Sequence, residues 1–183
     1  MQYRTDGFVL RCYRAGDGSA LAEATNSSYS HLKTFMPWAV SSQTASEAEE
    51  LIAGFVDRYA KREDFVVGIF AHDGLLLGGS GYHLRERTFE DRAGETGMWI
   101  RQSHAGKGLG TSVLIAMLRW GLTEWPWERI EWRCDVDNVA SAAIARKSGM
   151  AEEGLLRRCG RKPDGRFRDT LVFAALRGEW SRP

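Results

Sequence analysis

The sequence predicts one domain with a mixed α/β sheet, and three observations support this prediction. Apolar patterns of period two and period 3.6 alternate in the order strand, helix, helix, three strands, helix, strand, helix and two strands. This order is not a repeated strand–helix–strand array, so it favours a mixed sheet over an all-parallel one. No repeat, low-complexity tract or proline-rich linker divides the 183 residues, so we expect a single domain over 1–183.

The composition is that of a globular protein and excludes several functional classes. Apolar residues make up 43% of the chain and charged residues 27%, which excludes disorder as the main state. The net charge of +1 is smaller than proteins that coat nucleic acid usually show, so we expect no nucleic-acid partner. The three cysteines and four histidines have no ligand spacing, so we expect no metal. Without a signal-peptide core or a run of 18 apolar residues, we expect a cytoplasmic protein that does not contact membranes.

The first part of the chain predicts one strand and two helices. Residues 8–13 have the composition of a strand, and a turn at 16–19 supplies a cap for a helix at 20–29. Thr44 and Glu47 have the spacing of a capping box, in which each side chain binds the backbone N–H of the other. The helix behind this box has apolar residues at helical spacing: Ala48, Leu51, Ile52, Phe55, Val56 and Tyr59.

The middle of the chain predicts a hairpin followed by a charged connection. Residues 65–70 and 75–77 are rich in strand-forming residues, and Asp73-Gly74 between them is a strong hairpin signal. The glycine-rich segment 78–81 predicts a bulge or the close approach of another backbone. We expect the charged stretch 85–94 to be a solvated loop.

The second half of the chain predicts alternating strands and helices. Residues 95–100 have the pattern of a strand, and an apolar stripe predicts a helix from about 111 to 125. At 130–136, apolar residues alternate with charged ones, and this period of two predicts a strand. A helix is expected to begin at Asp137-Asn138 and to end at Gly149.

The chain is predicted to finish with a hairpin. Its two strands are expected at 154–158 and 169–176, on either side of a turn at 162–165.

The stretch 99–111 has the strongest chemical signal. A strand runs into a turn with glycines at 106, 108 and 110, and the turn opens an amphipathic helix. Exposed backbone N–H groups and the helix dipole favour a phosphate at such a turn. A Walker A loop is excluded because neither Ser nor Thr follows Gly-Lys, and a dinucleotide fingerprint is excluded because Thr111 occupies its third glycine position. A plain structural turn stays open as the alternative.

Several segments match the motifs of one family. Gly108-Leu109-Gly110 fits the second half of the pyrophosphate motif Arg/Gln-x-x-Gly-x-Gly/Ala, although Ala105 stands where Arg or Gln is usual. Residues 137–141 fit an Asn-x-x-Ser helix start, and 147–150 fit a Lys-x-Gly-Phe ending with Met in place of Phe. With these motifs in this order, residues 5–178 resemble the GNAT acyltransferase superfamily and its RimJ/RimL-like branch of protein N-acetyltransferases.

The resemblance implies the GNAT acyl-CoA N-acyltransferase fold, with a central twisted, mostly antiparallel sheet, a splayed pair of parallel strands and helices on both faces. It implies acetyl-CoA as co-substrate, bound between strands 96–101 and 130–136, and no metal. Asn138 also suits the ordinary role of a helix N-cap, and Lys107 that of a solvated side chain. The implied cofactor-binding residues are Trp99, Ile100, Gly106, Lys107, Gly108, Leu109, Gly110, Thr111 and Asn138.

The resemblance also implies that a neutral amine attacks the thioester directly. Ser141 matches the position that protonates the leaving thiolate, and Glu95 is the candidate general base. The ordinary alternatives are a small first-turn residue for Ser141 and an arginine-paired carboxylate for Glu95. Tyr82 and His83 are reserve bases, and His104 is expected to neighbour the phosphate.

The acceptor is the least determined part of the prediction. The resemblance places Tyr29, Phe35, Trp38 and Tyr82 along the acceptor groove. A protein α-amine has a pKa of about 7.7–8.0 and a lysine side chain one of about 10.4, so a weak base favours a protein N-terminus. A small amine (polyamine, amino acid or antibiotic) and a non-catalytic acyl-CoA-binding module remain alternatives. The branch commonly forms homodimers, but the sequence identifies no interface.

Overall fold

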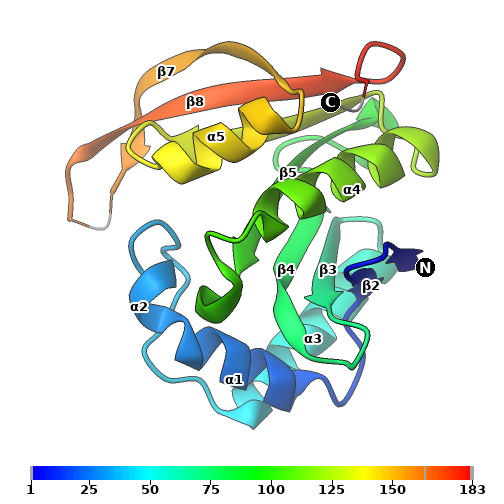
Figure 1. The fold of residues 1–183 in the computed structure, drawn as a ribbon, viewed down its shortest axis with the longest axis vertical. Helices are drawn as coiled ribbons and strands as arrows, with labels where there is room; N and C mark the ends of the chain where they lie inside the picture. Colours follow the sequence, from blue (N-terminus) through cyan, green and yellow to red (C-terminus); the bar gives the residue numbers. More distant parts are fainter. Residues whose placement is uncertain (1, 163, 182–183) are drawn as a thin grey trace. The chain divides into compact units, whose positions relative to one another are not determined.

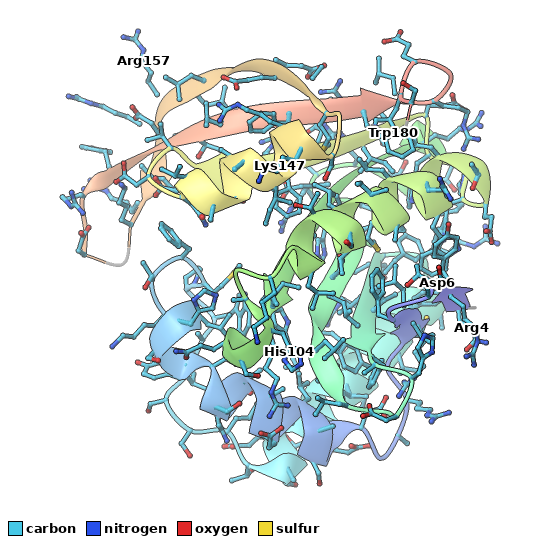
Figure 2. All side chains as sticks on the ribbon, in the orientation of Figure 1. Arg4, Asp6, His104, Lys147, Arg157 and Trp180 are labelled. Atoms are coloured by element: carbon cyan, nitrogen blue, oxygen red, sulfur yellow. The ribbon has the colours of Figure 1, made fainter. Side chains whose placement is uncertain are left out.

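The computed structural model describes residues 2–162 and 164–181 and divides into two compact units (Figures 1 and 2). The first unit is Met1–His83 with Met98–Lys107, and the second is Leu84–Gly97 with Gly108–Pro183. Strand β5 (Ala93–Ile100) contributes residues to both units. None of the helices that the structure describes has the length and apolarity that a membrane span requires. The expectation of one domain over the whole chain stays a prediction.

The first unit contains an antiparallel sheet and three helices. Its strands pair in the order β1-β2-β3-β4, as consecutive antiparallel neighbours. The strands are β1 (Gln2–Arg4), β2 (Val9–Cys12), β3 (Asp64–Phe70) and β4 (Leu76–His83). The helices are α1 (Gly18–Ser27), α2 (Tyr29–Leu32) and α3 (Ala45–Ala60).

The core of the first unit lies where α1 and α3 pack on each other and on its sheet. Burying each large aliphatic side chain there contributes roughly 1.5–3 kcal/mol. The buried cluster consists of Tyr13, Leu21, Ala22, Ala24, Ala48, Ile52, Phe70 and Leu76.

Local signals predicted this unit well, with three exceptions. The capping box is confirmed, because Thr44 Oγ1 accepts the N–H of Glu47 at 3.2 Å and the Glu47 carboxylate accepts the N–H of Thr44 at 2.7 Å.

The prediction of a single helix at 20–29 is wrong, since α1 ends at Ser27 and α2 begins at Tyr29. The apolar stripe of α3 is narrower than predicted, because Leu51 and Val56 are 43% and 46% exposed. Strand β1 was not predicted, since three residues carry too little pattern.

The glycines of β4 meet another backbone, as predicted. A Cβ on Gly78 would lie 2.2 Å from the carbonyl oxygen of Trp99, and a Cβ on Gly79 would lie 2.5 Å from the Trp99 Nε1. The N–H of Arg101 donates to the Leu77 carbonyl at 2.8 Å, which joins the end of β5 to β4. Glycine at 78 and 79 therefore permits this close approach.

The second unit combines one parallel and two antiparallel strand pairs. The start of β5 runs parallel to β6 (Arg129–Asp135), and β8 (Phe167–Leu176) pairs antiparallel with both β6 and β7 (Ala151–Arg161). Helices α4 (Leu109–Thr123) and α5 (Val139–Lys147) pack on each other and on β6. The predicted mixed, mostly antiparallel sheet with a parallel pair is confirmed. The final hairpin is also confirmed with longer strands, although Pro163 of its predicted turn lies outside the described residues.

One prediction for the second unit is wrong in part, and another is confirmed. The charged stretch 85–94 is not a simple loop, because it contains a 3₁₀ turn at Phe89–Asp91 and the first residues of β5. The strand predicted at 130–136 is confirmed as β6, which ends one residue earlier, at Asp135. Its Glu131 is only 3% exposed, while Val136 lies beyond the strand and is 40% exposed. Glu131 is buried because three arginine side chains neutralise it.

Candidate active site

The turn before α4 has a backbone conformation that favours glycine. Gly106 and Gly108 have φ angles of 74° and 85°, in the left-handed region. Gly108 is the N-cap of α4, and its carbonyl accepts the N–H of Ser112 at 3.2 Å. A Cβ on either glycine would meet no other heavy atom within 4 Å, so the need for glycine here is conformational. Helix α4 begins at Leu109, so Gly110 and Thr111 lie in its first turn.

The side chains of this turn bind within the turn itself. Lys107 is exposed, and its Nζ donates to the Ser103 carbonyl at 2.9 Å. His104, labelled in Figure 2, places its Nδ1 3.0 Å from the Ser103 Oγ. Ala105, which replaces the usual Arg or Gln of the motif, has an extended backbone. Lys107 is therefore the cationic side chain that the turn itself offers to an anion.

Aromatic residues from the segment after α2, from β4 and from β5 lie in the first unit. Trp38 is 49% exposed and packs edge-on against half-buried Trp99, with ring centroids 6.2 Å apart. Phe35 is 38% exposed, whereas the Tyr82 side chain is fully buried. Trp38 and Phe35 therefore offer accessible ring surface to an acceptor, whereas Tyr82 does not.

Three other candidates of the first unit have ordinary environments. Tyr29 is half-buried with Lys33 Nζ 5.4 Å from its ring centroid, and Ile100 is half-buried at the end of β5. The reserve base His83 places its Nδ1 2.6 Å from a carboxylate oxygen of Asp64. That contact holds the imidazole in place.

Glu95 is a largely buried carboxylate on β5, in the second unit. Its side chain is 14% exposed, and its Oε1 accepts a hydrogen bond of 2.6 Å from Arg85. The Nε of Arg133 lies 3.7 Å from the other carboxylate oxygen. Glu95 therefore has the arginine partner that the sequence offered as an alternative. Its role as a general base stays a prediction.

Beside Glu95, the buried Glu131 is bound by three arginines. Its carboxylate accepts hydrogen bonds from Arg87 at 2.6 Å, Arg129 at 2.9 Å and Arg133 at 2.9 Å. Burial alone would raise the pKa of Glu131, but the hydrogen bonds from the guanidinium groups outweigh burial and lower it. Arg133 therefore contacts both carboxylates from a firmly held position.

Asn138 and Ser141 are joined at the start of α5. Asn138 is the N-cap, and its Oδ1 accepts the N–H of Ser141 at 3.1 Å. The indole Nε1–H of Trp132, on β6, donates to the Ser141 Oγ at 3.1 Å. The hydroxyl therefore has one accepting position filled and keeps its own proton for another partner.

The neighbouring thiol is that of Cys134. Cys134 lies two residues after Trp132 on β6 and is 7% exposed. Burial raises the pKa of the Cys134 thiol, and the Ser141 hydroxyl acts in the opposite direction because it stabilises a thiolate. Ser141 thus has the chemistry of a hydrogen-bond donor to sulfur.

Only some of the predicted site residues in the second unit contact one another. Asn138 and Ser141 share a hydrogen bond, whereas among the described residues Glu95 makes no hydrogen bond or ion pair with either. The sequence did not reveal the roles of Trp132 and Arg85. The alternation in β6 was a usable signal for Trp132, because it placed Trp132 and Cys134 on the same face.

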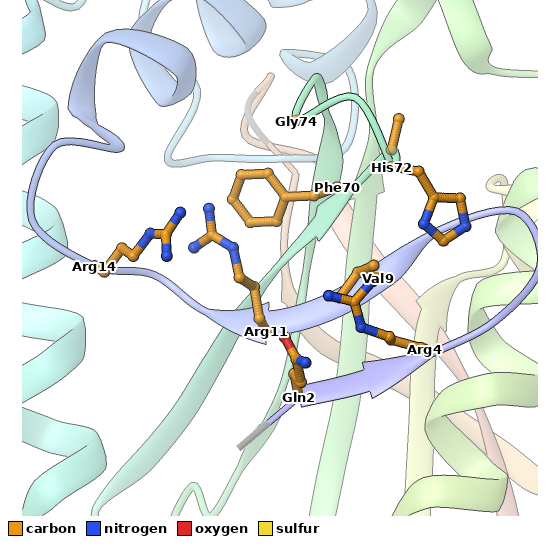
Figure 3. A pocket seen from close by; sticks show the side chains of 9 residues that line it. Gln2, Arg4, Val9, Arg11, Arg14, Phe70, His72 and Gly74 are labelled. Carbon is orange, nitrogen blue, oxygen red and sulfur yellow. The ribbon is translucent and has the colours of Figure 1, made fainter.

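A separate cavity in the first unit is lined by basic side chains. It measures about 230 Å³, and Figure 3 shows Arg4, Arg11, Arg14 and His72 around it. Arg11 already pairs with Asp17 at 2.6 Å. None of the predicted site residues lines this cavity. Within 2–162 and 164–181, no group of three or more His, Cys, Asp or Glu residues could hold a metal ion.

Comparison with known proteins identifies the family. Residues 8–151 match the family model described as an acetyltransferase (GNAT) domain. YdaF of Bacillus subtilis (strain 168), a proposed ribosomal N-acetyltransferase, is 26% identical over 94% of this chain and 92% of its own length. The ribosomal-protein-serine acetyltransferase of Escherichia coli (strain K12) is 24% identical over 79% of each chain.

Solved structures show the same fold. RimL, a ribosomal L7/L12 alpha-N-protein acetyltransferase solved in complex with coenzyme A, superposes with a TM-score of 0.85. The alignment covers 96% of this chain and 98% of RimL at 18% identity, so this likeness concerns the fold. Because the family model spans most of the sequence and the fold agrees, the chain belongs to the GNAT acetyltransferase family, in its RimJ/RimL-like branch, and is an acetyl-CoA-dependent acyltransferase.

Proposed function

We propose that the chain transfers the acetyl group of acetyl-CoA to the α-amino group of a protein N-terminus. The observation that carries this proposal is the hydroxyl of Ser141, whose oxygen accepts the indole N–H of Trp132 and which keeps its own proton for donation. A hydroxyl held in this way suits a reaction in which a thiolate leaves. The relatives support the acceptor class, since one of them is named a ribosomal-protein-serine acetyltransferase.

The turn before α4 fits the pyrophosphate of acetyl-CoA. The first N–H groups of a helix have no acceptor within the helix, and the helix dipole favours an anion beside them. Gly106 and Gly108 leave open space in front of the turn, and Lys107 adds a positive charge. The backbone supplies most of these donors, so Ala105 in the motif is compatible with binding.

Strand β5 suits the pantetheine arm of the same ligand. The parallel ladder between β5 and β6 has its last pair at Glu95 and Glu131, although β5 continues to Ile100 and β6 to Asp135. The pantetheine arm is proposed to bind the backbone of β5 beyond this last pair.

In the proposed reaction, the amine nitrogen attacks the thioester carbonyl and the carbon–sulfur bond breaks. Glu95 accepts a proton from the amine, directly or through water, and passes it to solvent. Ser141 donates its proton to the leaving sulfur and regains one from solvent. A thiol has a pKa of about 8.5, so the thiolate leaves readily and Ser141 assists without being essential.

The energetics favour an α-amine over a lysine side chain. Their pKa values differ by roughly 2.5 units, and each unit corresponds to about 1.36 kcal/mol. Deprotonating lysine at neutral pH therefore costs about 3.5 kcal/mol more. A carboxylate is a weak base and suits the easier amine.

The test is a panel of acceptors assayed by mass spectrometry with acetyl-CoA as donor. The panel contains peptides with Ser, Ala, Asp or Met at a free N-terminus, an N-blocked lysine peptide, polyamines and aminoglycosides. Acetylation of free N-termini but not of the blocked peptide is expected. Acetylation of a small amine alone would replace the proposed acceptor, and coenzyme A binding without any product would support a non-catalytic binding module.

A further inference from the structure

We infer that Arg85 occupies the place of the acceptor's ammonium group at Glu95, so that acceptor binding exchanges one cation for another. The inference rests on the proposed function, because it takes Glu95 as the group that receives the amine. It makes Arg85 a residue that determines acceptor affinity and selects for a primary ammonium.

The carboxylate of Glu95 is built to hold a cation. Its side chain is 14% exposed, and a carboxylate with so little contact with water requires a positive partner. Arg85 supplies the close contact at 2.6 Å, while Arg133 lies at 3.7 Å. The close position is therefore filled by a guanidinium.

Of the two guanidinium groups, that of Arg85 is the replaceable one. Arg133 is anchored by two hydrogen bonds to the buried Glu131, at 2.9 and 3.2 Å. The Arg85 side chain is 57% exposed, and its other donors make no hydrogen bond or ion pair with any residue that the structure describes. An ion pair with one exposed partner contributes little net free energy, so Arg85 can swing into water at small cost.

The arriving acceptor carries the charge that this exchange needs. With a pKa of about 7.7–8.0, a protein α-amine is mostly protonated at pH 7. A compact ammonium fits the same carboxylate with three donors, whereas a guanidinium binds as a planar fork. Once bound, the ammonium lies against the group proposed to take its proton. Arg85 therefore competes with the acceptor and is not needed for the chemistry.

Steady-state kinetics of Arg85→Gln test the exchange, with Arg92→Gln as a matched control. Arg92 lies on the same connection, also has a left-handed backbone and is 52% exposed in a pair with Glu128 at 2.5 Å. For an N-terminal peptide acceptor, Arg85→Gln is expected to lower the acceptor KM about two- to fivefold, the range that an exposed pair allows. The KM for acetyl-CoA should not change.

Two further variants separate competition from positioning. Arg85→Lys keeps a competing cation, so its acceptor KM should stay near the wild-type value. Arg92→Gln should match the wild type in kcat and in both KM values. An unchanged acceptor KM in Arg85→Gln, or a fall in kcat alone, would overturn the inference while leaving the proposed function intact. Glu95→Gln with wild-type kcat would overturn the inference together with the role of Glu95 as the base. Wild-type protein that acetylates no amine would overturn both the inference and the proposed function.

Discussion

The indole Nε1–H of Trp132 donates a hydrogen bond of 3.1 Å to the Oγ of Ser141. This bond links β6 to the first turn of α5, where the Asn138 cap binds the backbone N–H of the same serine. One residue is thus fixed by its side chain and by its backbone. These contacts fix the orientation of its side chain.

Trp132→Phe tests whether this orientation matters. The substitution keeps an aromatic ring at a site that is 4% exposed but removes the donor. A neutral hydrogen bond contributes about 1 kcal/mol, so kcat is expected to fall about fivefold while the KM for acetyl-CoA changes little. Coenzyme A release, followed with a thiol reagent, measures both constants.

Ser141→Ala is the companion to that variant. Loss of a proton donor costs about 100-fold or more in general acid catalysis, but a thiolate leaves readily and lowers this figure. We expect kcat to fall about ten- to a hundredfold. Wild-type kcat in Ser141→Ala would contradict the proposed role of the hydroxyl.

Gly108→Val tests the turn before α4. A φ of 85° costs a residue with a Cβ roughly 1–2 kcal/mol of conformational energy. The cost is higher for a β-branched residue such as valine, whose side chain is more restricted. The turn should distort, and the KM for acetyl-CoA should rise about tenfold or more, since a 1.4 kcal/mol loss of binding is tenfold. Gly7→Val is the control, because Gly7 has open space and no left-handed φ. Equal KM values in the two variants would remove the turn from the binding site.

Glu131→Gln tests the buried carboxylate through its pH dependence. Since the folded pKa lies below the unfolded value of about 4.3, the charge stabilises the fold above pH 4.3 and this contribution is lost at lower pH. Breaking a buried ion pair costs about 3–5 kcal/mol, and about 2 kcal/mol is expected here because the arginines are partly exposed.

The measurement is the free energy of unfolding in urea at pH 7, 5 and 3.5. The difference between the wild type and Glu131→Gln should be largest at pH 7 and should shrink at pH 3.5. A difference that does not vary with pH would show that the carboxylate is not charged in the folded protein.

Gly78→Ala tests the close approach of β4 and the end of β5. The added Cβ would lie 2.2 Å from the Trp99 carbonyl oxygen, a backbone atom that cannot move alone. Overpacking of this kind typically costs about 1–3 kcal/mol, so the melting temperature should fall by several degrees. Gly7→Ala, which meets no atom within 4 Å, should melt near the wild type.

The predictable parts of the fold depend on neighbouring residues in the chain. The capping box of Thr44 and Glu47 and the Asp73-Gly74 hairpin are local signals, and both elements form as expected. The burial of Glu131 is different, because Arg87 is 44 residues away in sequence. Alternation alone assigns a glutamate to the polar face, so it fails where distant arginines neutralise the charge.

The site was predictable to a similar extent. The glycine turn and the Asn138 cap follow from spacing, because each serves a helix end that the sequence marks. The pairing of Arg85 with Glu95 and the contact of Trp132 with Ser141 join separate elements. The sequence raised an arginine partner for Glu95 only as an alternative, without identifying Arg85, and the alternation in β6 did not by itself identify the bond from Trp132 to Ser141.

The most direct measurement uses one peptide that carries both a free α-amine and an internal lysine. The peptide is incubated with the protein and acetyl-CoA at neutral pH, and tandem mass spectrometry locates the acetyl group. We predict acetylation of the α-amine with the lysine unmodified. Acetylation of the lysine alone would contradict the account of a weak carboxylate base and an N-terminal acceptor.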